Sequence, residues 1–428
     1  MYKYLTSKLG LAVLLVALIG FGCDSTTDSL DTELDRDDQL ETLGAGDVID
    51  GSYIVVFDLP ENAKVTADYV QEFREDVKSS VEISNERIIA NYNKALQGFA
   101  ANLTDAQLDM LNRDERVAYV ERDKVVTLGP PCGTPNGGEC DDDDDGDDGD
   151  DGDDGDNGDD GDESDDGNGN GDDSDAITPW GIERVGGAVT YTGGTVSWVI
   201  DTGIQLDHPD LNVDADRGFT AFTSGPDGRD ADDLNGHGTH VAGTIGALNG
   251  IVGVASGVEQ VPVKVLDRRG SGSISGVIAG VDYVADNASS GDVANMSLGG
   301  GASDALDAAV ESAADQGILF AIAGGNSSAD VSGSSPARVD HPNTWTIAAT
   351  DVNDDFASFS NYGDPTSFAA PGVDVNSTWN DGGYNSISGT SMAAPHVAGI
   401  LIVNGGTVNS DGESSTAPDG VNYPIAVH

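Results

Sequence analysis

The stretch TVSWVIDTG (195–203) joins an apolar strand to a carboxylate at its end. The strand leads to Asp201, and the Thr-Gly that follows allows a tight exit from it. Similar apolar runs occur at 261–266, 292–298 and 317–324, separated by patterns with helical spacing at 240–247, 274–288 and 305–317. Strands that alternate with helices in this way are typical of a parallel sheet covered on both faces. From residue 177 onward, the sequence therefore predicts an α/β domain that binds its ligand at the carboxyl ends of strands.

A different pattern precedes this domain and predicts a small α+β unit over residues 51–128. Thr104 and Gln107 have the spacing of a capping box, which marks the start of a helix. The order β-α-β-β-α-β indicates a small open-faced sandwich of the ferredoxin-like type. Its elements are predicted at 51–58 (strand), 67–81 (helix), 87–103 (two strands), 104–114 (helix) and 117–128 (two strands).

The N-terminus predicts a signal peptide over residues 1–23. Lys3 and Lys8 give it a positive start, and the apolar run that follows is too short to span a bilayer comfortably. The run ends in Gly-Phe-Gly-Cys, which resembles a lipoprotein processing site, although Gly and Phe are unusual at its first two positions. Two interpretations stay open: lipidation of Cys23, which would anchor the precursor to a membrane, and plain signal cleavage near Gly22.

Two polar segments lack apolar periodicity and are predicted to be disordered, a tether over residues 24–50 and a linker over 129–176. The linker contains Cys132 and Cys140, for which we predict a local disulfide because an exported protein meets an oxidising environment. The acidic part of the linker, 141–175, holds 21 acidic residues and no Lys or Arg. It contains too few apolar residues to offset the entropy of ordering. It does not match an EF-hand loop, because a Gly stands at the twelfth position, where a Glu is needed.

The net charge of −57 limits the partners of the protein. The residues after 175 include 30 acidic and only 7 basic side chains, and Lys264 is the only lysine among them. A surface of this sign repels nucleic acid and anionic membranes, so we predict neither as a partner. Such a surface suits solubility where salt screens the self-repulsion, which favours a halophilic source. An ordinary acidic secreted protein is the alternative.

Three residues with the chemistry for nucleophilic catalysis occur at the ends of elements. Asp201 ends a strand, His237 lies between glycines at a helix start, and Ser391 lies at another helix start after a glycine. A serine hydroxyl is a poor nucleophile unless an imidazole takes its proton and a carboxylate orients that imidazole. The helix that begins at Ser391 would also offer a free backbone N–H to an oxyanion.

Motifs in one fixed order resemble the subtilisin-like serine proteases, most closely their proteinase K branch. They are DTGIQLDHPDL (201–211), GHGTHVAG (236–243), KVLDRRGSG (264–272), SLGG (297–300), AGGN (323–326) and GTSMAAPHVAG (389–399). The order Asp, His, Ser is that of subtilisin. The resemblance implies a catalytic domain over 177–428, with a parallel sheet of the seven-stranded type flanked by helices. Residues 51–128 resemble the propeptide domain that inhibits and chaperones these proteases.

The resemblance assigns a role to each motif. It implies that Asp201 orients His237, that His237 acts as general base and then acid, and that Ser391 forms the acyl-enzyme. The side chain of Asn326 and the backbone N–H of Ser391 would bind the oxyanion. A substrate strand would lie between two segments, with one side chain in a pocket whose Gly325 stands where the family usually has Ala. The residues involved are Gly270, Ser271 and Gly272 on one edge, Ser297, Leu298 and Gly299 on the other, and Ala323, Gly324 and Gly325 in the pocket.

Other residues are interpreted as structural. His240 and His396 lie a helical turn or more from the reactive residues, which indicates packing rather than metal binding, and His208 is assigned to a surface turn. Where calcium-binding relatives carry Asp, this chain has Ser367, so that site is not transferred. Structural calcium at another position is consistent with the many Asp residues, and the chemistry requires no cofactor. The resemblance ends near residue 400, so either a short strand at Tyr423–Val427 or reduced packing is expected at the C-terminus.

Together these observations predict a secreted, self-processing, monomeric serine endopeptidase whose partners are peptide or protein substrates and its own propeptide. The uncharged pocket favours a large apolar or aromatic side chain before the scissile bond, and removal of the propeptide is expected by cleavage near Leu128. Membrane contact is expected only through a lipid on the precursor. Two alternatives remain: an inactive protease-like scaffold whose acidic tract binds cations, and an esterase or acyltransferase that uses the same three residues.

Overall fold

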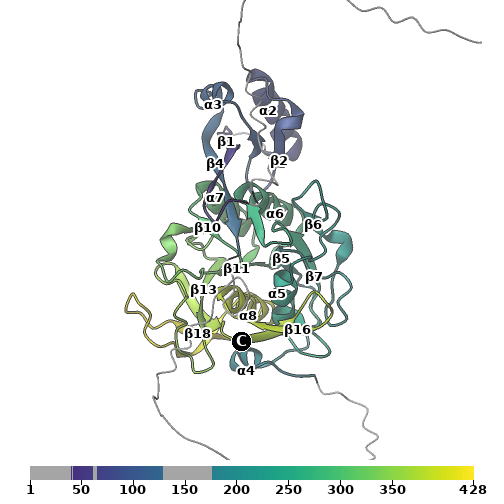
Figure 1. Cartoon of the computed structure of the whole chain (residues 1–428), viewed down its shortest axis with the longest axis vertical. Helices are drawn as coiled ribbons and strands as arrows, with labels where there is room; N and C mark the ends of the chain where they lie inside the picture. The colour runs from purple at the N-terminus through teal and green to yellow at the C-terminus, as the bar shows by residue number, and fades with distance from the viewer. Residues whose placement is uncertain (1–39, 41, 61–64, 129–175) are drawn as a thin grey trace, which may run out of the picture. The chain divides into compact units, whose positions relative to one another are not determined.

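The computed structural model describes residues 40, 42–60, 65–128 and 176–428 (Figure 1). The predicted signal peptide, lipidation of Cys23, disulfide between Cys132 and Cys140 and disordered acidic linker lie outside the described residues. Among the helices that the structure describes, none is long and apolar enough to cross a membrane.

The N-terminal part has the predicted order β-α-β-β-α-β. Its four strands lie in the order β2-β3-β1-β4, and all neighbours are antiparallel. One face of this sheet is buried against the two helices, in a cluster that includes Phe57, Val77, Phe99 and Leu111. The expected capping box of Thr104 and Gln107 starts the second helix. The elements are β1 Val48–Phe57, α2 Ala67–Ser80, β2 Ile88–Tyr92, β3 Gly98–Asn102, α3 Asp105–Leu111 and β4 Val117–Thr127.

Residues 117–127 form the single strand β4, so the prediction of two strands in this segment was wrong. No Gly or Pro interrupts the segment, and its charged middle continues the strand because the charges have partners. Asp123 accepts hydrogen bonds from Ser52 Oγ at 2.9 Å and from Ser275 Oγ at 2.6 Å. The uninterrupted strand is long enough for its end to pair with β8 (Ser271–Ser273) of the larger domain.

The predicted tether extends too far toward its C-terminal end. β1 begins at Val48, and a turn precedes it in which Asp47 Oδ2 accepts the N–H of Gly44 at 2.9 Å. Gly46 N–H donates to the Val125 carbonyl, and Val125 N–H donates to the Asp47 carbonyl, both at 2.9 Å. This segment is ordered because it satisfies backbone groups at the end of β4 that would otherwise be buried without partners.

The larger domain contains a nine-stranded sheet in the order β17-β18-β14-β13-β11-β9-β5-β7-β6. All neighbours in it are parallel except β17 and β18. The sheet is mostly parallel, as expected, and exceeds seven strands because short strands extend both edges. β18 confirms the expected short strand near the C-terminus. The strands are β5 Ser197–Asp201, β6 Phe219–Thr220, β7 Gln260–Lys264, β9 Val293–Met296, β11 Leu319–Ala323, β13 Thr344–Thr350, β14 Thr366–Pro371, β17 Asn409–Glu413 and β18 Pro424–Val427.

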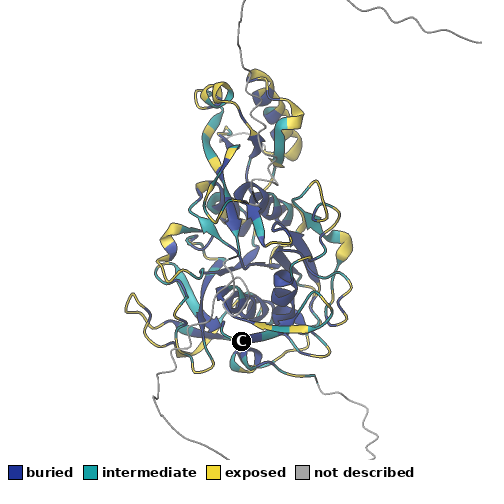
Figure 2. Cartoon of the chain, in the orientation of Figure 1, coloured by how far each residue is buried: buried dark blue, intermediate teal, exposed yellow. Residues whose placement is uncertain are grey.

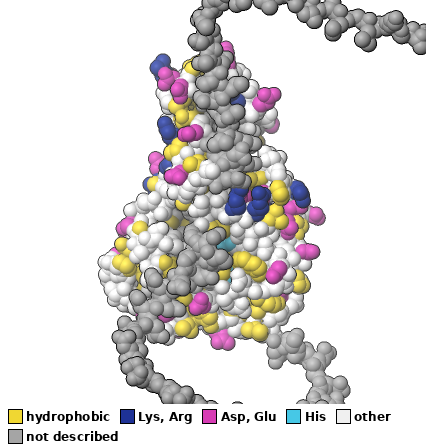
Figure 3. All heavy atoms as spheres, viewed as in Figure 1, with side chains coloured by type: hydrophobic (Ala, Val, Ile, Leu, Met, Phe, Trp, Pro, Cys, Tyr) yellow, Lys and Arg dark blue, Asp and Glu magenta, His cyan; other side chains and the backbone are white. Residues whose placement is uncertain are grey.

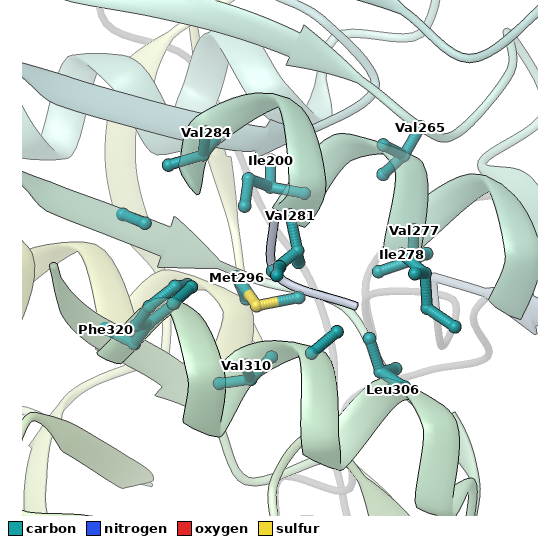
Figure 4. Close-up of a cluster of buried hydrophobic side chains, with 14 of the residues drawn as sticks. Ile200, Val265, Val277, Ile278, Val281, Val284, Met296, Leu306, Val310 and Phe320 are labelled. Carbon is teal, nitrogen blue, oxygen red and sulfur yellow. The ribbon is translucent and has the colours of Figure 1, made fainter. Parts of the chain in front are cut away.

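Helices cover both faces of this sheet (Figure 1). Val281 of α6 and Val310 of α7 pack with Ile200 and Phe320 in one buried cluster (Figure 4), whereas Val199 belongs to the cluster on the other face with α5 and α8. Neighbouring residues of a strand point to opposite faces, so the centre of β5, Trp198–Ile200, is apolar on both faces, and only its two end residues are polar. α8 is buried almost all round (Figure 2). The remaining elements are α4 Trp180–Arg184, α5 His237–Gly246, α6 Ile274–Asn287, α7 Asp304–Asp315, α8 Thr390–Val403, β10 Gly300–Gly301, β12 Ser334–Ser335, β15 Val375–Thr378 and β16 Tyr384–Ile387.

Part of the negative charge of the sequence lies on the folded surface that the structure describes. Asp and Glu side chains are spread over the face shown in Figure 3, where Lys and Arg side chains occur singly or in small groups. Some of the arginines are neutralised by carboxylates: Arg184 pairs with Asp354, and Arg338 with Asp304, each at 2.7 Å.

Candidate active site

The three predicted reactive residues lie where elements of the larger domain begin or end. Asp201 is the last residue of β5, His237 is the first of α5, and Ser391 is the second of α8. His237 Nδ1 lies 2.8 Å from Asp201 Oδ1, and both side chains are buried. With Nδ1 donating to the carboxylate, Nε2 of a neutral imidazole is the proton acceptor.

The Ser391 side chain has a different partner. Its hydroxyl donates to the Ser297 carbonyl at 3.1 Å, and the Ser297 hydroxyl donates to the Ser391 carbonyl at 2.7 Å. Within the described residues, no hydrogen bond joins Ser391 to His237, although α5 and α8 pack against each other. The structure therefore joins Asp201 to His237 by a hydrogen bond, and the Ser391 hydroxyl is bonded to a carbonyl.

Asn326 lies beside the start of α8. Its Oδ1 accepts hydrogen bonds from the Thr390 backbone N–H at 2.9 Å and from the Thr390 hydroxyl at 2.8 Å. Because Oδ1 is occupied in this way, the amide presents Nδ2 as a donor on its other side. Nδ2 lies 3.2 Å from the position that a Cβ on Gly389 would take, so a larger residue at 389 would crowd it.

Asn326 and Ser391 line a common cavity of about 490 Å³. The predicted pocket and one predicted substrate edge line the same cavity, namely Ser297, Leu298, Gly299, Ala323, Gly324 and Gly325. None of these six residues is charged. The other predicted edge, Gly270–Gly272, overlaps β8, which faces β4.

The end of β4 lies between the two predicted substrate edges. On one side, Val126 and Thr127 pair antiparallel with Gly272 and Ser271, and Leu128 N–H donates to the Gly270 carbonyl at 2.8 Å. On the other side, Thr127 forms an antiparallel bridge with Gly299. The chain thus places its own extended segment where a substrate strand was expected.

Asn361 supports the loop that carries Asn326, and it was not predicted from the sequence. Its Oδ1 accepts the N–H groups of Ser327 and Ala329, each at 3.0 Å, and its Nδ2 donates to the Gly324 carbonyl at 2.9 Å. The side chain is buried, and all three bonds go to backbone groups. No motif could reveal it, because the bonded residues are more than thirty positions away in the sequence.

The other histidines have local partners. His240 Nε2 lies 2.9 Å from the Val375 carbonyl and His396 Nδ1 lies 2.8 Å from the Met392 carbonyl. Burial lowers the pKa of His240 to about 3 and that of His396 to about 4. His208 was expected in a surface turn, but its side chain is buried because Nδ1 accepts the Asp210 N–H and Nε2 contacts the Gly383 carbonyl.

The described residues contain no group of three or more His, Cys, Asp or Glu side chains that could hold a metal ion. The Ser367 hydroxyl donates to the Pro365 carbonyl at 3.2 Å. Because calcium also accepts carbonyl and water ligands, structural calcium stays a prediction.

Comparison with known proteins identifies both parts of the chain. Residues 193–403 match the subtilase family, and residues 52–129 match the peptidase inhibitor I9 family. An alkaline serine exoprotease A of Vibrio alginolyticus is 40% identical over 81% of this chain, which spans 59% of that protein. An extracellular serine proteinase of Thermus sp. is 36% identical over 91% of this chain and 88% of its own length.

A solved structure agrees with these matches. The crystal structure of a cold-adapted subtilisin-like serine proteinase is 40% identical and superposes with a TM-score of 0.51. It covers 59% of this chain and 98% of its own. The sequence matches and the structural match therefore agree on the same family.

Proposed function

The chain belongs to the subtilase family of serine endopeptidases, and from this premise we propose that it is a secreted, self-processing enzyme that acts through Asp201, His237 and Ser391. In the first step His237 Nε2 takes the hydroxyl proton of Ser391, and Oγ forms an ester with the substrate carbonyl. His237 then gives the proton to the leaving amine, and water hydrolyses the ester by the same route. The 2.8 Å bond between Asp201 and His237 supports these roles.

We propose that Asn326 Nδ2 and the backbone N–H of Ser391 bind the oxyanion. The two bonds that Thr390 donates to Asn326 Oδ1 support this proposal, because they fix the orientation of the amide before substrate binds. Preorganised donors of this kind stabilise a transition state because they need no reorganisation during the reaction.

The N-terminal domain is proposed to act as the enzyme's own inhibitor. The observation that carries this proposal is the position of Thr127, which is paired with Ser271 on one side and Gly299 on the other. While this strand is in place, a substrate cannot form the same backbone bonds. Self-cleavage just past this strand, near Leu128, would leave the inhibitor as a separate polypeptide.

Carboxylates hold the two domains together away from the groove. Asp123 accepts the Ser275 N–H at 3.0 Å at the start of α6, and Glu121 accepts the Ala305 N–H at 3.0 Å at the start of α7. In the opposite direction, Asp282 of α6 accepts backbone N–H groups of Asn93, Lys94 and Ala95 at 2.7–3.1 Å. Helix N-termini favour negative charge, so the contacts of Asp123 and Glu121 stabilise the inhibited state, and the hydrogen bonds to Asp282 add to them.

The preference for a large apolar or aromatic residue before the scissile bond is a proposal that rests on the pocket. Ala323, Gly324 and Gly325 leave it uncharged and with little side-chain volume of its own. Secretion is supported by the N-terminal apolar run and by the name of the Thermus relative. If Cys23 is lipidated, cleavage near Leu128 would release the enzyme from the membrane, with the acidic segment acting as a solvated leash before cleavage.

Labelling by a fluorophosphonate tests the enzyme, since such probes react with an activated serine. Mature protein should be labelled at Ser391, and Ser391→Ala should stay an uncleaved precursor. Absence of labelling would favour the inactive scaffold, and hydrolysis of esters without hydrolysis of peptides would favour an esterase. N-terminal sequencing and intact mass of the mature protein would locate the cleavage site and show whether the acidic segment remains.

A further inference from the structure

Thr202, the residue after Asp201, uses every polar atom that it has. Its N–H donates to Asp201 Oδ1 at 2.7 Å, and its carbonyl accepts a hydrogen bond from Lys264 Nζ at 2.6 Å. Its hydroxyl donates to Asp233 Oδ1 at 2.9 Å and accepts the N–H of Gly238, also at 2.9 Å. Gly238 follows His237, so this one buried residue is bonded to Asp201 itself and to the backbone N–H of the residue next to His237.

Asp233 fixes the turn that leads into His237. Its Oδ1 also accepts the N–H groups of Asn235 and Gly236, each at 2.9 Å. Its Oδ2 accepts the N–H of Thr239 at 2.9 Å and the Thr239 hydroxyl at 2.7 Å. A buried carboxylate with this many donors is held in one orientation, and it holds the first turn of α5 relative to Thr202.

Lys264 holds Thr202 from the other side. It lies on β7 directly across from Asp201 on β5, its side chain is fully buried, and Nζ lies 3.1 Å from Asp227 Oδ1. Removing an ammonium group from water is costly, so a buried lysine needs a compensating role. Lys264 is also the only lysine in the sequence after residue 175, and this one lysine is buried in the interior of the larger domain.

The carboxylate of Asp201 depends on these contacts for its orientation. Within the described residues Asp201 Oδ2 has no hydrogen-bond partner, so only the two bonds to Oδ1 fix the group. The segment after Asp201 packs tightly against the start of α5. A Cβ on Gly238 would lie 2.0 Å from the Gly203 carbonyl oxygen and 3.2 Å from Asp201 Cβ. A shift of Thr202 would therefore move Asp201 relative to His237.

From this arrangement we propose that Thr202, Asp233 and Lys264 form a clamp of positioning residues that sets the distance between Asp201 and His237. The clamp acts through Asp201 and His237 and does not touch substrate. The inference rests on the catalytic roles proposed above for these two residues.

Thr202→Val tests the clamp, because it keeps the shape of the side chain and removes both hydroxyl bonds. We expect kcat to fall by roughly one to two orders of magnitude with KM unchanged, since misplacement of catalytic groups affects the transition state. Thr202→Ser keeps the hydroxyl and should recover most of the lost kcat. Thr344→Val is the matched control, since it removes a buried hydroxyl that likewise donates and accepts, at the start of β13.

Each variant is expressed as the full chain. Variants that mature slowly are cut by trace wild-type enzyme that carries an affinity tag, and the tagged enzyme is withdrawn before peptide hydrolysis is measured. Melting temperatures are recorded in parallel, because a purely structural network would lower stability in Thr202→Val and Thr344→Val alike and leave kcat unchanged in both. That outcome would overturn the clamp.

Lys264→Met and Asp233→Asn keep the proposal testable if Thr202→Val does not fold. Lys264→Met removes the donor to the Thr202 carbonyl, and Asp227 retains Arg268 as a partner at 3.3 Å. Either variant should lower kcat with KM unchanged. A folded variant with the kcat of the wild type would show that the replaced residue does not position Asp201 and His237, and would overturn its role in the clamp. Inactive wild-type protein would instead refute the proposed function, so the two failures are distinguishable.

Discussion

Replacing Asp123 by Ala should weaken the binding of the inhibitor domain to the catalytic domain, because Asp123 is bonded to α6 of the catalytic domain. Asp123 is fully buried and accepts two hydrogen bonds from Ser275, from the N–H at 3.0 Å and the hydroxyl at 2.6 Å. Hydrogen bonds to a charged group contribute about 1.5 kcal/mol or more each, so their loss amounts to about 3 kcal/mol. At about 1.4 kcal/mol for each factor of ten, the inhibition constant should rise roughly 100-fold.

The assay is inhibition of mature enzyme by the polypeptide of residues 24–128, with circular dichroism to show that each variant polypeptide folds. Ser52→Ala is the matched control, because it removes the 2.9 Å bond from Ser52 to Asp123 inside the inhibitor and leaves both bonds from Ser275. If Ser52→Ala and Asp123→Ala weaken inhibition equally, the effect lies in the stability of the inhibitor domain, and the reasoning from the contacts with α6 is refuted.

Three further predictions follow from the geometry. Asn326→Leu should lower kcat by about 100-fold or more with little change in KM, because it removes the proposed oxyanion donor, and a KM effect alone would contradict this role. Gly46→Ala should weaken inhibition, because the φ of +82° at Gly46 disfavours a side chain and Gly46 is bonded to Val125 near the end of β4. Gly51→Ala is the control and should not weaken inhibition, because Gly51 has a similar φ of +74° but is bonded to Leu103, away from the groove. The neutral, buried His240 and His396 have pKa values lowered to about 3 and about 4 by burial, so the folded state binds fewer protons than the unfolded state. Their contribution to stability is therefore complete above pH ~6.5 and is lost as the pH falls, by up to about 1.4 kcal/mol per pH unit for each histidine. Urea unfolding of fluorophosphonate-inactivated enzyme should show a shallower loss toward pH 4 in His396→Gln than in the wild type.

The elements and the reactive residues could be predicted because their signals are local. Periodicity identified β5 and α6. His237, between two glycines, and Ser391, two residues after Gly389, were recognised as helix starts, which they are. The continuous strand β4 could not be predicted, because the partners that keep its charged middle extended lie far away in the sequence, such as Ser275 for Asp123. The ordered turn before β1 was missed for the same reason, since its bonds are made with Val125.

The supporting residues around the site were beyond sequence reasoning for a related cause. The Asn361 side chain bonds only to backbone groups, and Asp233 and Thr202 bond to several of them. Every residue has such groups, so these partners leave no mark in the sequence. Asp201 and His237, in contrast, are bonded through side chains whose chemistry is rare enough to form a motif. Motifs thus report which atoms react, whereas the fold decides how firmly those atoms are held.

Gly325 shows how this difference changes a prediction. It stands where the family usually has Ala, but its φ is +103° and a Cβ there would lie 2.5 Å from Asn361 Nδ2. Gly325→Ala would strain the backbone and displace the amide that holds the Gly324 carbonyl, and so disturb the loop that carries Asn326. We therefore expect kcat to fall for small and large side chains before the scissile bond alike. Steady-state kinetics on a matched peptide series would check this, and a rise in KM confined to large side chains would mean that the alanine merely narrows the pocket.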